Sequence, residues 1–396
     1  MSTFTPSTFT ESSFTESEER LELRRQVARL SSRYGREWFT EKARAGEKTT
    51  ELWLEIGKAG YLGANLPEEY GGSGGGIGDI AAVCEELAAQ GCPLLMMVVS
   101  PAICGTVIAR YGTEAQKQKW LPGIADGTAT MAFAITEPDA GTNSHNITTT
   151  ARRDGAAWVL KGQKIYISGV DEAENVLVVA RAEDSRTGKL KPCLFVVPTD
   201  STGFEFTAIP MEIVSPELQF QVFIDDVRLP ADALVGDEDG GLVQLFAGLN
   251  PERIMAASFS TGMARYALEK ASAHAKERTV FKAPIGSHQA VAHPLAQAHI
   301  ETELARLMTQ KAAALCDAGD DMGAGEAANM AKYAAAEAAC HAVDAAVQTH
   351  GGNGITQEYG MAGLLVAARA GRIAPVSREM ILNFVAMHSL GLPKSY

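Results

Sequence analysis

A short segment, Thr136–Thr142, combines hydroxyl side chains with residues that favour a turn. Its sequence, TEPDAGT, predicts a turn that presents threonine hydroxyls and backbone N–H groups at the edge of a β-rich region. Hydrogen-bond donors of this kind suit the polar rim of a heterocyclic ring. An ordinary β-turn has the same composition, so the segment by itself leaves both interpretations open.

Glu252 is a second candidate for chemistry, within Asn250-Pro251-Glu252-Arg253. Asparagine is a favoured N-cap and proline a favoured first helical residue, so the spacing predicts a helix with Glu252 in its first turn. A carboxylate at this position is a candidate general base, but the helix dipole favours an acid there whatever its function. Because the dipole lowers the pKa of Glu252, burial must outweigh it if the residue is to act as a base near neutral pH.

Arg278 is a candidate anion contact, because a guanidinium group forms a fixed fork of donors that suits a diphosphate. A solvated charge at a helix end is the alternative interpretation. The glycine-rich segment Gly71–Gly78 also suggests a phosphate-binding loop. It lacks the preceding strand and the Gly-Lys-Ser/Thr ending of such loops, so we expect a flexible surface turn.

These residues require a scaffold, and the periodicity of the chain predicts one of the α+β class. We expect a disordered tail at residues 1–17, an N-terminal α-helical domain at 18–127, a middle antiparallel β-barrel domain at 128–237 and a C-terminal four-helix bundle at 238–396. The expected helices cover residues 18–45, 50–59, 80–90, 101–111, 113–120, 251–277, 294–317 and 325–349. The expected strands cover residues 158–160, 164–167, 176–180, 194–197 and 218–224.

Composition excludes several classes of protein. The 396-residue chain has a net charge of -13 and no cluster of basic residues, which argues against a nucleic-acid partner. The apolar stretch Leu95–Ile108 is too short and too interrupted to span a membrane, and the N-terminus does not have the pattern of a secretory signal. Six cysteines without paired spacing indicate reduced thiols and no zinc site, so we expect a cytoplasmic protein.

Four separated stretches resemble the acyl-CoA dehydrogenase family, and together they extend over nearly the whole chain. The four stretches are Gly60–Gly72, Tyr111–Pro122, Phe133–Gly169 and Gln348–Thr356. The resemblance implies FAD as the cofactor and an acyl-CoA thioester as the substrate. It also implies a homotetramer, because family members share each cofactor between neighbouring subunits.

The resemblance assigns the pyrimidine end of the flavin to the turn at 136–142 and to a strand that follows it. In the family, backbone and hydroxyl groups of this turn contact both the flavin and the acyl-CoA, and Thr142 falls in both roles. Tyr166 replaces the tryptophan that packs on the ring, and Ser168 replaces a threonine that bonds near flavin N5. Alternation along a strand places these two side chains on one face, although a core aromatic is the alternative interpretation of Tyr166. The residues assigned by resemblance are Ile135, Thr136, Gly141, Thr142, Tyr166 and Ser168.

A second group resembles the family residues that hold the FAD of a neighbouring subunit. Arg278 and Phe281 match an Arg-x-x-Phe-Gly element that clamps the pyrophosphate, with Lys282 where the family has glycine. The glycines of the fourth stretch permit close backbone approach on the adenosine side. Two further positions near the C-terminus match residues close to the FAD. The assigned residues are Arg278, Phe281, Gln289, Gln348, Gly351, Gly352, Ser377 and Glu379.

The usual catalytic glutamate of the family is missing, because Pro375 stands at its position. A minority of members, including isovaleryl- and long-chain-type enzymes, carry the base on another helix just before an arginine. Glu252 followed by Arg253 resembles that arrangement, so Glu252 is the expected base, with Asn250 and Arg253 as substrate contacts. Proline also lacks the backbone N–H that holds the thioester carbonyl in the family.

The resemblance therefore implies FAD-dependent conversion of an acyl-CoA thioester to the trans-2-enoyl-CoA in fatty acid metabolism. Electrons are then expected to pass to electron transfer flavoprotein. Loss of the usual glutamate and its N–H group leaves two alternatives open. One is a flavin-dependent oxidase or monooxygenase on the same fold, and the other is a non-catalytic FAD-binding partner subunit.

Overall fold

A computed structural model of the chain describes residues 16–183 and 187–394. Residues 1–15 of the predicted tail lie outside the described residues. Ser17 accepts a hydrogen bond from the N–H of Arg20 and thereby caps the first helix. The Glu16 carboxylate pairs with Arg24 in that helix, at 2.8 Å. No helix in the described part of the chain is long and apolar enough to cross a membrane.

The N-terminal part is helical, as predicted, and one predicted segment divides into two helices. Residues 32–34 interrupt the segment 18–45. The predicted cap at Thr113 is confirmed, since its hydroxyl accepts from Gln116 N–H while the Gln116 side chain accepts from Thr113 N–H. The elements are α1 (Glu18–Ser31), α2 (Gly35–Ala45), α3 (Thr50–Lys58), α4 (Ile77–Ala89), α5 (Leu95–Met97), the π-helix η2 (Val98–Gly105), α6 (Thr106–Tyr111) and α7 (Glu114–Asp126).

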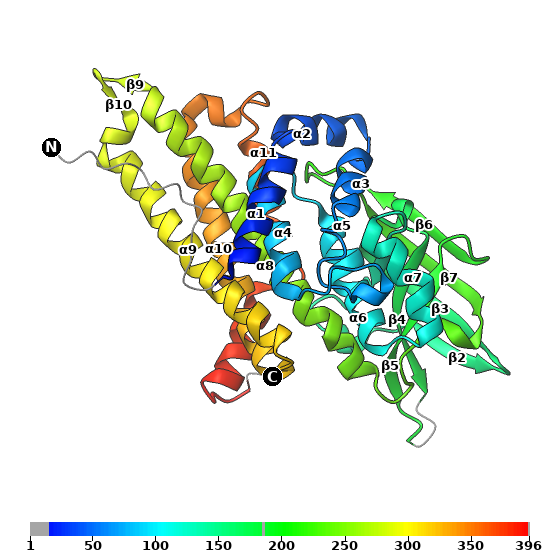
Figure 1. Cartoon of the computed structure of the whole chain (residues 1–396). Coiled ribbons are helices and arrows are strands. Elements are labelled where there is room, and N and C mark those ends of the chain that lie inside the picture. The colour runs from blue at the N-terminus through cyan, green and yellow to red at the C-terminus, as the bar shows by residue number, and fades with distance from the viewer. Residues whose placement is uncertain (1–15, 184–186, 395–396) are drawn as a thin grey trace.

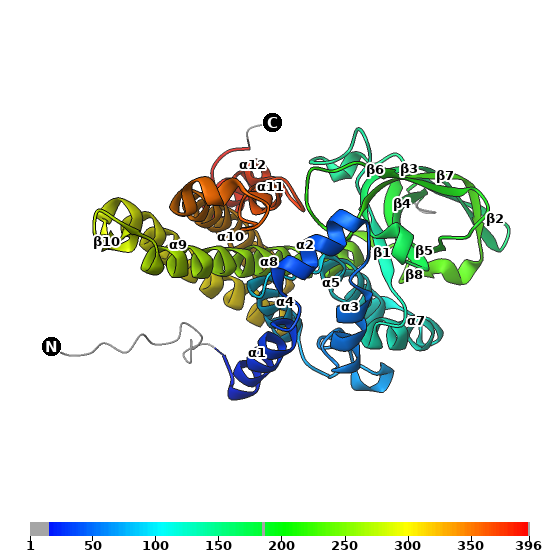
Figure 2. The same cartoon turned by 90° about the horizontal axis from the view of Figure 1, so that it is seen from above.

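The middle part forms a strongly curved sheet (Figure 2) with the strand order β6-β7-β3-β2-β4-β5-β8, and β1 pairs with β4. Most pairs are antiparallel, but β1 and β2 each run parallel to β4. The strands β1, β2, β6 and β8 were not predicted from the sequence; β2 and β6 are mostly exposed and do not follow a clear apolar alternation. The strands are β1 (Met131–Ala134), β2 (Thr150–Asp154), β3 (Ala157–Ser168), β4 (Asn175–Glu183), β5 (Leu190–Pro198), β6 (Phe204–Ile209), β7 (Gln219–Leu229) and β8 (Leu234–Val235).

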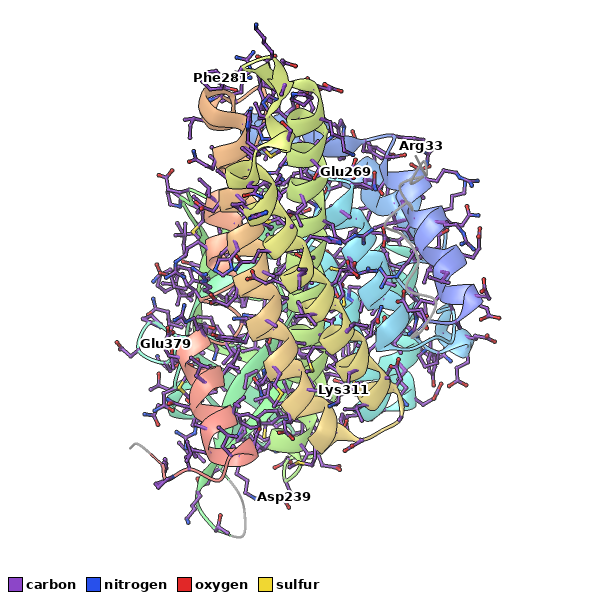
Figure 3. All side chains as sticks on the ribbon, turned by 90° about the vertical axis from the view of Figure 1, so that its left-hand side faces the viewer. Arg33, Asp239, Glu269, Phe281, Lys311 and Glu379 are labelled. Carbon is purple, nitrogen blue, oxygen red and sulfur yellow. The ribbon has the colours of Figure 1, made fainter. Side chains whose placement is uncertain are left out.

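Three long helices dominate the C-terminal part and lie side by side (Figures 1 and 3). Helices α8 and α10 run in the same direction. Asn250, in the first half of α8, contacts Asp321 at the start of α10, and His274, near the end of α8, stacks on His350 at the end of α10. Alanine-rich faces allow these helices to approach closely. The helices are α8 (Gly241–Glu277), α9 (Gln289–Asp317), α10 (Asp321–His350), α11 (Ala362–Ala370) and α12 (Arg378–Phe384), and a small hairpin, β9 (Thr279–Val280) and β10 (Ala283–Pro284), follows α8.

The predicted helix start at Asn250 is wrong, because α8 begins at Gly241 and includes Pro251. Proline inside a helix removes one hydrogen bond and costs about 3 kcal/mol. Packing of the preceding turns opposes this cost: Gly248 lies so close to η2 and α6 that an added Cβ would meet Ile103 and Val107 at 3.0 and 2.9 Å. Tertiary contacts therefore extend the helix past a residue that normally starts one.

A buried ionic network joins the N-terminal helices to α8 and α9. Arg24 of α1 bonds Glu85 and Glu86 of α4 at 3.0 and 2.9 Å. Arg265 of α8 bonds the same two carboxylates, and Arg306 of α9 forms an ion pair with Glu85 at 2.6 Å. These ion pairs and charge-assisted hydrogen bonds hold α4 against α8, and α8 is the helix that carries Glu252.

Candidate active site

Glu252 lies in the interior of α8, with its side chain partly buried. Its carboxylate forms no hydrogen bond or ion pair with any residue in the described part of the chain. Burial raises the pKa of Glu252 to about 7, and the nearby positive charges of Arg253 and Lys332 only partly oppose this rise. The expectation that a helix N-terminus lowers the pKa of Glu252 is therefore wrong, because α8 begins at Gly241. Loss of solvent around the carboxylate determines the pKa instead.

The surroundings of Glu252 come from distant parts of the chain. Cys104 of η2 is fully buried and near enough for Glu252 to add to the rise of its thiol pKa, after the larger effect of burial. Lys332 of α10 is also buried, and desolvation lowers its pKa to about 8. A carboxylate without a partner thus faces an interior region bounded by η2, α8 and α10.

Asn250 and Arg253, the predicted substrate contacts, are buried beside Glu252. Arg253 donates to Leu249 O and to Asn250 Oδ1, both at 3.2 Å, and Asn250 Nδ2 donates to the carbonyl of Asp321. The Nε–H of Arg253 has no hydrogen-bond partner among the described residues. The pair is therefore fixed in place with one buried donor still available.

The segment around Pro375 packs against Lys332. The Lys332 ammonium donates to the carbonyl of Val376 at 2.5 Å. The N–H of Val376 donates to no other residue in the described part of the chain. Ser377 is the N-cap of α12, with its hydroxyl accepting from Met380 N–H, and the Glu379 side chain is exposed. Val376 thus offers a free donor next to the position where proline removes one.

The turn at 136–142 also leaves backbone donors free. Within the described residues, the N–H groups of Ile135, Thr136, Gly141 and Thr142 have no hydrogen-bond partner. Gly141 and Thr142 are exposed, and a Cβ added to Gly141 would meet nothing within 4 Å. The carbonyl side of the turn is held by Lys164, which is buried behind it. Free donors in open space fit the oxygen and nitrogen acceptors on the rim of a flavin.

The regular alternation predicted for Tyr166 and Ser168 is interrupted. The pairing of β3 with β7 shifts register between Lys164 and Ile167, and Tyr166 has a φ of 57°. Such a bulge redirects side chains, so their common face does not follow from alternation. Tyr166 is 57% exposed, whereas Ser168 is partly buried and exchanges hydrogen bonds with Gln219.

The members of the second group from Arg278 to Gly352 lie far from Glu252, whereas Ser377 and Glu379 lie near Lys332. Arg278 ends α8, 26 residues after Glu252, which corresponds to about 39 Å of helix. Figure 1 shows the β9–β10 hairpin, which contains Phe281, at the end of the long helices opposite the sheet. Figure 3 shows Phe281 at one end of the molecule and Asp239, which lies just before α8, at the opposite end. Phe281 is 90% exposed with a φ of 51°.

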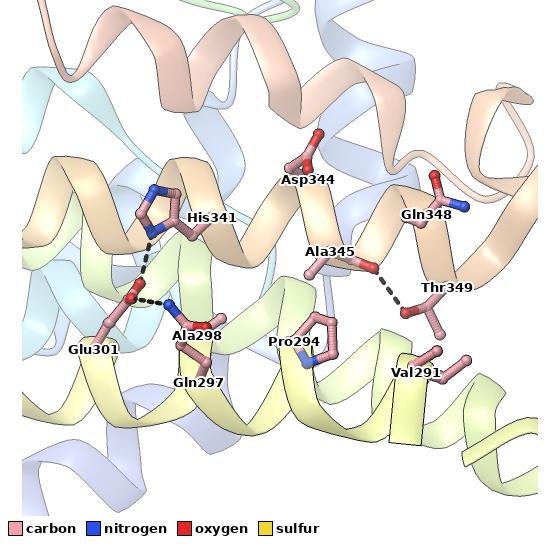
Figure 4. A pocket seen from close by; sticks show the side chains of 11 residues that line it. Val291, Pro294, Gln297, Ala298, Glu301, His341, Asp344, Ala345, Gln348 and Thr349 are labelled. Atoms are coloured by element: carbon pink, nitrogen blue, oxygen red, sulfur yellow. Dashed lines mark hydrogen bonds and ion pairs between the residues drawn. The ribbon is translucent and has the colours of Figure 1, made fainter. Parts of the chain in front are cut away.

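A groove of about 530 Å³ between α9 and α10 lies near this second group (Figure 4). Gln348 and Thr349 line one end, and His341, Glu301 and Gln297 form a bonded row at the other. Gln289, Gly351 and Gly352 are also exposed in this part of the molecule. The predicted site residues therefore form two separate clusters within one chain. The residues that sequence reasoning missed, Cys104, Lys164, Lys332 and Val376, have no distinctive spacing, and only the fold brings them to the site.

Comparison with known proteins identifies the class to which this scaffold belongs. Three models of the acyl-CoA dehydrogenase family match in order: the N-terminal domain at residues 17–128, the middle domain at 132–222 and the C-terminal domain at 239–390. The chain therefore belongs to the acyl-CoA dehydrogenase family, and its fold is the three-part fold of that family.

Individual relatives narrow the assignment. The chain is 66% identical over 380 residues to acyl-CoA dehydrogenase FadE12 of Mycobacterium tuberculosis, covering 96% of this chain and 98% of the relative. It is 32% identical over 350 residues to the mitochondrial long-chain specific acyl-CoA dehydrogenase of Mus musculus, covering 88% and 81%. A solved structure of glutaryl-CoA dehydrogenase from Mycobacterium smegmatis in complex with FADH2 has a TM-score of 0.89 and 27% identity, with 98% of both chains covered. The protein is an acyl-CoA dehydrogenase that uses FAD, and its substrate is an acyl-CoA.

Proposed function

We propose that Glu252 is the base that removes the α-proton of the acyl-CoA. The observation that carries this proposal is a partly buried carboxylate that has no partner among the described residues and a pKa of about 7. A pKa near the working pH suits a general base, because the group is partly deprotonated and still basic enough to accept a proton. Pro375, at the position of the usual base, cannot serve in its place.

The reaction balances with Glu252 in this role. Glu252 accepts the proton from Cα, and the C–H electrons left at Cα form the double bond of a trans-2-enoyl thioester. FAD held at the turn 136–142 would supply the acceptor for the hydride that leaves Cβ. Negative charge develops on the thioester carbonyl during this step. The Val376 N–H supports the proposal as a donor to that oxygen, in place of the N–H that Pro375 lacks.

Asn250 and Arg253 have supporting roles in the proposal. Asn250 fixes the Arg253 guanidinium by a 3.2 Å bond, and Arg253 carries positive charge next to the base. This charge favours the ionised form of Glu252 and attracts the acyl-CoA. Removal of the guanidinium is therefore expected to raise the pKa of Glu252 and to weaken substrate binding together.

The assembly proposed for the enzyme is a homotetramer that shares its cofactors between subunits. One FAD cannot reach both predicted clusters in a single chain if about 39 Å of α8 separates them. The exposed Phe281 and the exposed glycines after α10 would then contact the FAD of a neighbour. Electron transfer flavoprotein as the electron acceptor, a cytoplasmic location and domain boundaries near residues 127 and 237 complete the proposal.

Anaerobic flavin reduction tests the assignment of the base. The oxidised enzyme is mixed with a panel of acyl-CoA thioesters of different chain length, and loss of the flavin absorption band is followed in time. The Glu252→Gln variant should bind the thioester but bleach at least about 100-fold more slowly than the wild type. Glu269→Gln, at an exposed carboxylate on the same helix, is a control for loss of negative charge. Full activity of Glu252→Gln would refute the assignment.

A further inference from the structure

A buried ion pair lies directly behind the turn with the free N–H donors. Lys164 is fully buried, and Glu137 is 4% exposed. The Lys164 ammonium donates to Glu137 Oε1 at 2.9 Å and to the carbonyl of Ile135 at 3.0 Å. The two side chains thus connect strand β3 with the first residues of the turn.

The Glu137 carboxylate is fully occupied by donors. Its two oxygens accept from the N–H and hydroxyl groups of Thr148 and Thr149, at 2.5 to 2.9 Å. Burial alone would raise the pKa of Glu137, but Lys164 and these hydrogen bonds outweigh it and hold the pKa at about 2. Burial lowers the pKa of Lys164 to about 8, with Glu137 opposing the change. Both groups are charged at neutral pH, and Glu137 anchors the lysine.

The bond from Lys164 to Ile135 determines where the next N–H points. A peptide unit is planar and trans, so its C=O and N–H groups point in opposite directions. Lys164 holds the carbonyl of Ile135 inward, and the N–H of Thr136, which belongs to the same peptide, must therefore point away from Lys164. The N–H of Ile165 fixes the carbonyl of Thr136 at 2.9 Å and prevents the following peptide from rotating.

We propose that Lys164, anchored by Glu137, is a positioning residue that orients the Ile135–Thr136 peptide so that its N–H is offered to the flavin rim. The ammonium also polarises this peptide, because a charged donor on the carbonyl strengthens the hydrogen bond that the N–H makes. A stronger bond to the flavin rim favours the reduced, more electron-rich flavin. The proposal depends on FAD binding and not on the role of Glu252.

The test uses the full-length protein and needs no acyl-CoA. The double variant Glu137→Gln/Lys164→Met removes both charges and so leaves no unpaired buried carboxylate, which would otherwise be strongly destabilising. Val227→Ala is the matched control, since Val227 is fully buried in the core of the sheet, where it pairs with Leu160 of β3. For each protein, the FAD dissociation constant, the visible flavin spectrum, the flavin reduction potential and the melting temperature of the apoprotein are measured.

The double variant should bind FAD about three- to tenfold more weakly, the loss expected for one hydrogen bond, with an altered flavin spectrum and a more negative potential. Val227→Ala should lower the melting temperature without these changes. Glu137→Gln alone removes the charge that anchors Lys164 but leaves its ammonium, so it should weaken FAD binding measurably but less than the double variant, and it serves as the test if the double variant does not fold. The proposal would be overturned if the flavin properties of the folded test variant matched those of the wild type, or changed no more than those of Val227→Ala.

Discussion

Replacement of Lys332 by methionine is expected to raise the pKa of Glu252, because it removes a buried positive charge that favours the ionised carboxylate. At an effective dielectric constant of about 20, two unit charges about 4 Å apart interact by about 4 kcal/mol, and the energy halves at about 8 Å. Glu252 and Lys332 form no ion pair within 4.0 Å. The interaction falls to about 1.4 kcal/mol at about 12 Å, and the loss of that energy moves the pKa upward by about one pH unit, from about 7 to about 8.

Anaerobic stopped-flow measurement of flavin reduction at a series of pH values between about 5.5 and 9 gives this pKa directly. The rate should rise with pH as Glu252 loses its proton, and the midpoint should shift upward in Lys332→Met. Lys332→Arg retains the charge, so it should leave the midpoint unchanged even if the bond to the Val376 carbonyl is altered. A midpoint that shifts equally in both variants, or a shift that persists when Glu252 is also replaced by glutamine, would refute the electrostatic reasoning.

Three further changes test other parts of the account. Val376→Pro removes the free N–H and should slow flavin reduction about 100-fold, whereas Val376→Ala keeps the N–H and should have little effect; equal rates would contradict the proposed donor. Gly262→Ala would place a Cβ 2.3 Å from the carbonyl oxygen of Glu85, and it should destabilise the fold by about 2 kcal/mol or more in thermal unfolding; an unchanged melting temperature would show that α4 and α8 can separate freely. Arg278→Ala should weaken FAD binding at least about tenfold although it lies far from Glu252, and unchanged affinity would argue against cofactor sharing.

The order of the three parts of the fold could be predicted from local patterns. The periodicity of α3 and the cap at Thr113 depend on residues close together in the chain, and the structure confirms both. The start of α8 could not be predicted in this way. Local rules place a helix start at Pro251, but the packing of Gly248 against Ile103 and Val107 decides the outcome.

The candidate site was predicted only in part, for the same reason. The resemblance to the family predicted Glu252 as the base. Its pKa, however, depends on burial beside Cys104 and Lys332, which are far away in the sequence. The bulge at Tyr166 likewise depends on pairing with β7, and no local pattern of the strand predicts it. The free N–H groups of the turn become visible only once the partners of its carbonyls are known.

Exchange of the substrate α-hydrogen with solvent tests the role of Glu252 most directly, because it isolates proton transfer from hydride transfer. The enzyme is first reduced, so that no net oxidation can occur, and is then incubated with an acyl-CoA in D2O. Mass spectrometry measures deuterium at Cα. The wild type should incorporate deuterium, and Glu252→Gln should incorporate none above the uncatalysed rate while still binding the thioester. Undiminished exchange in Glu252→Gln would mean that another group is the base.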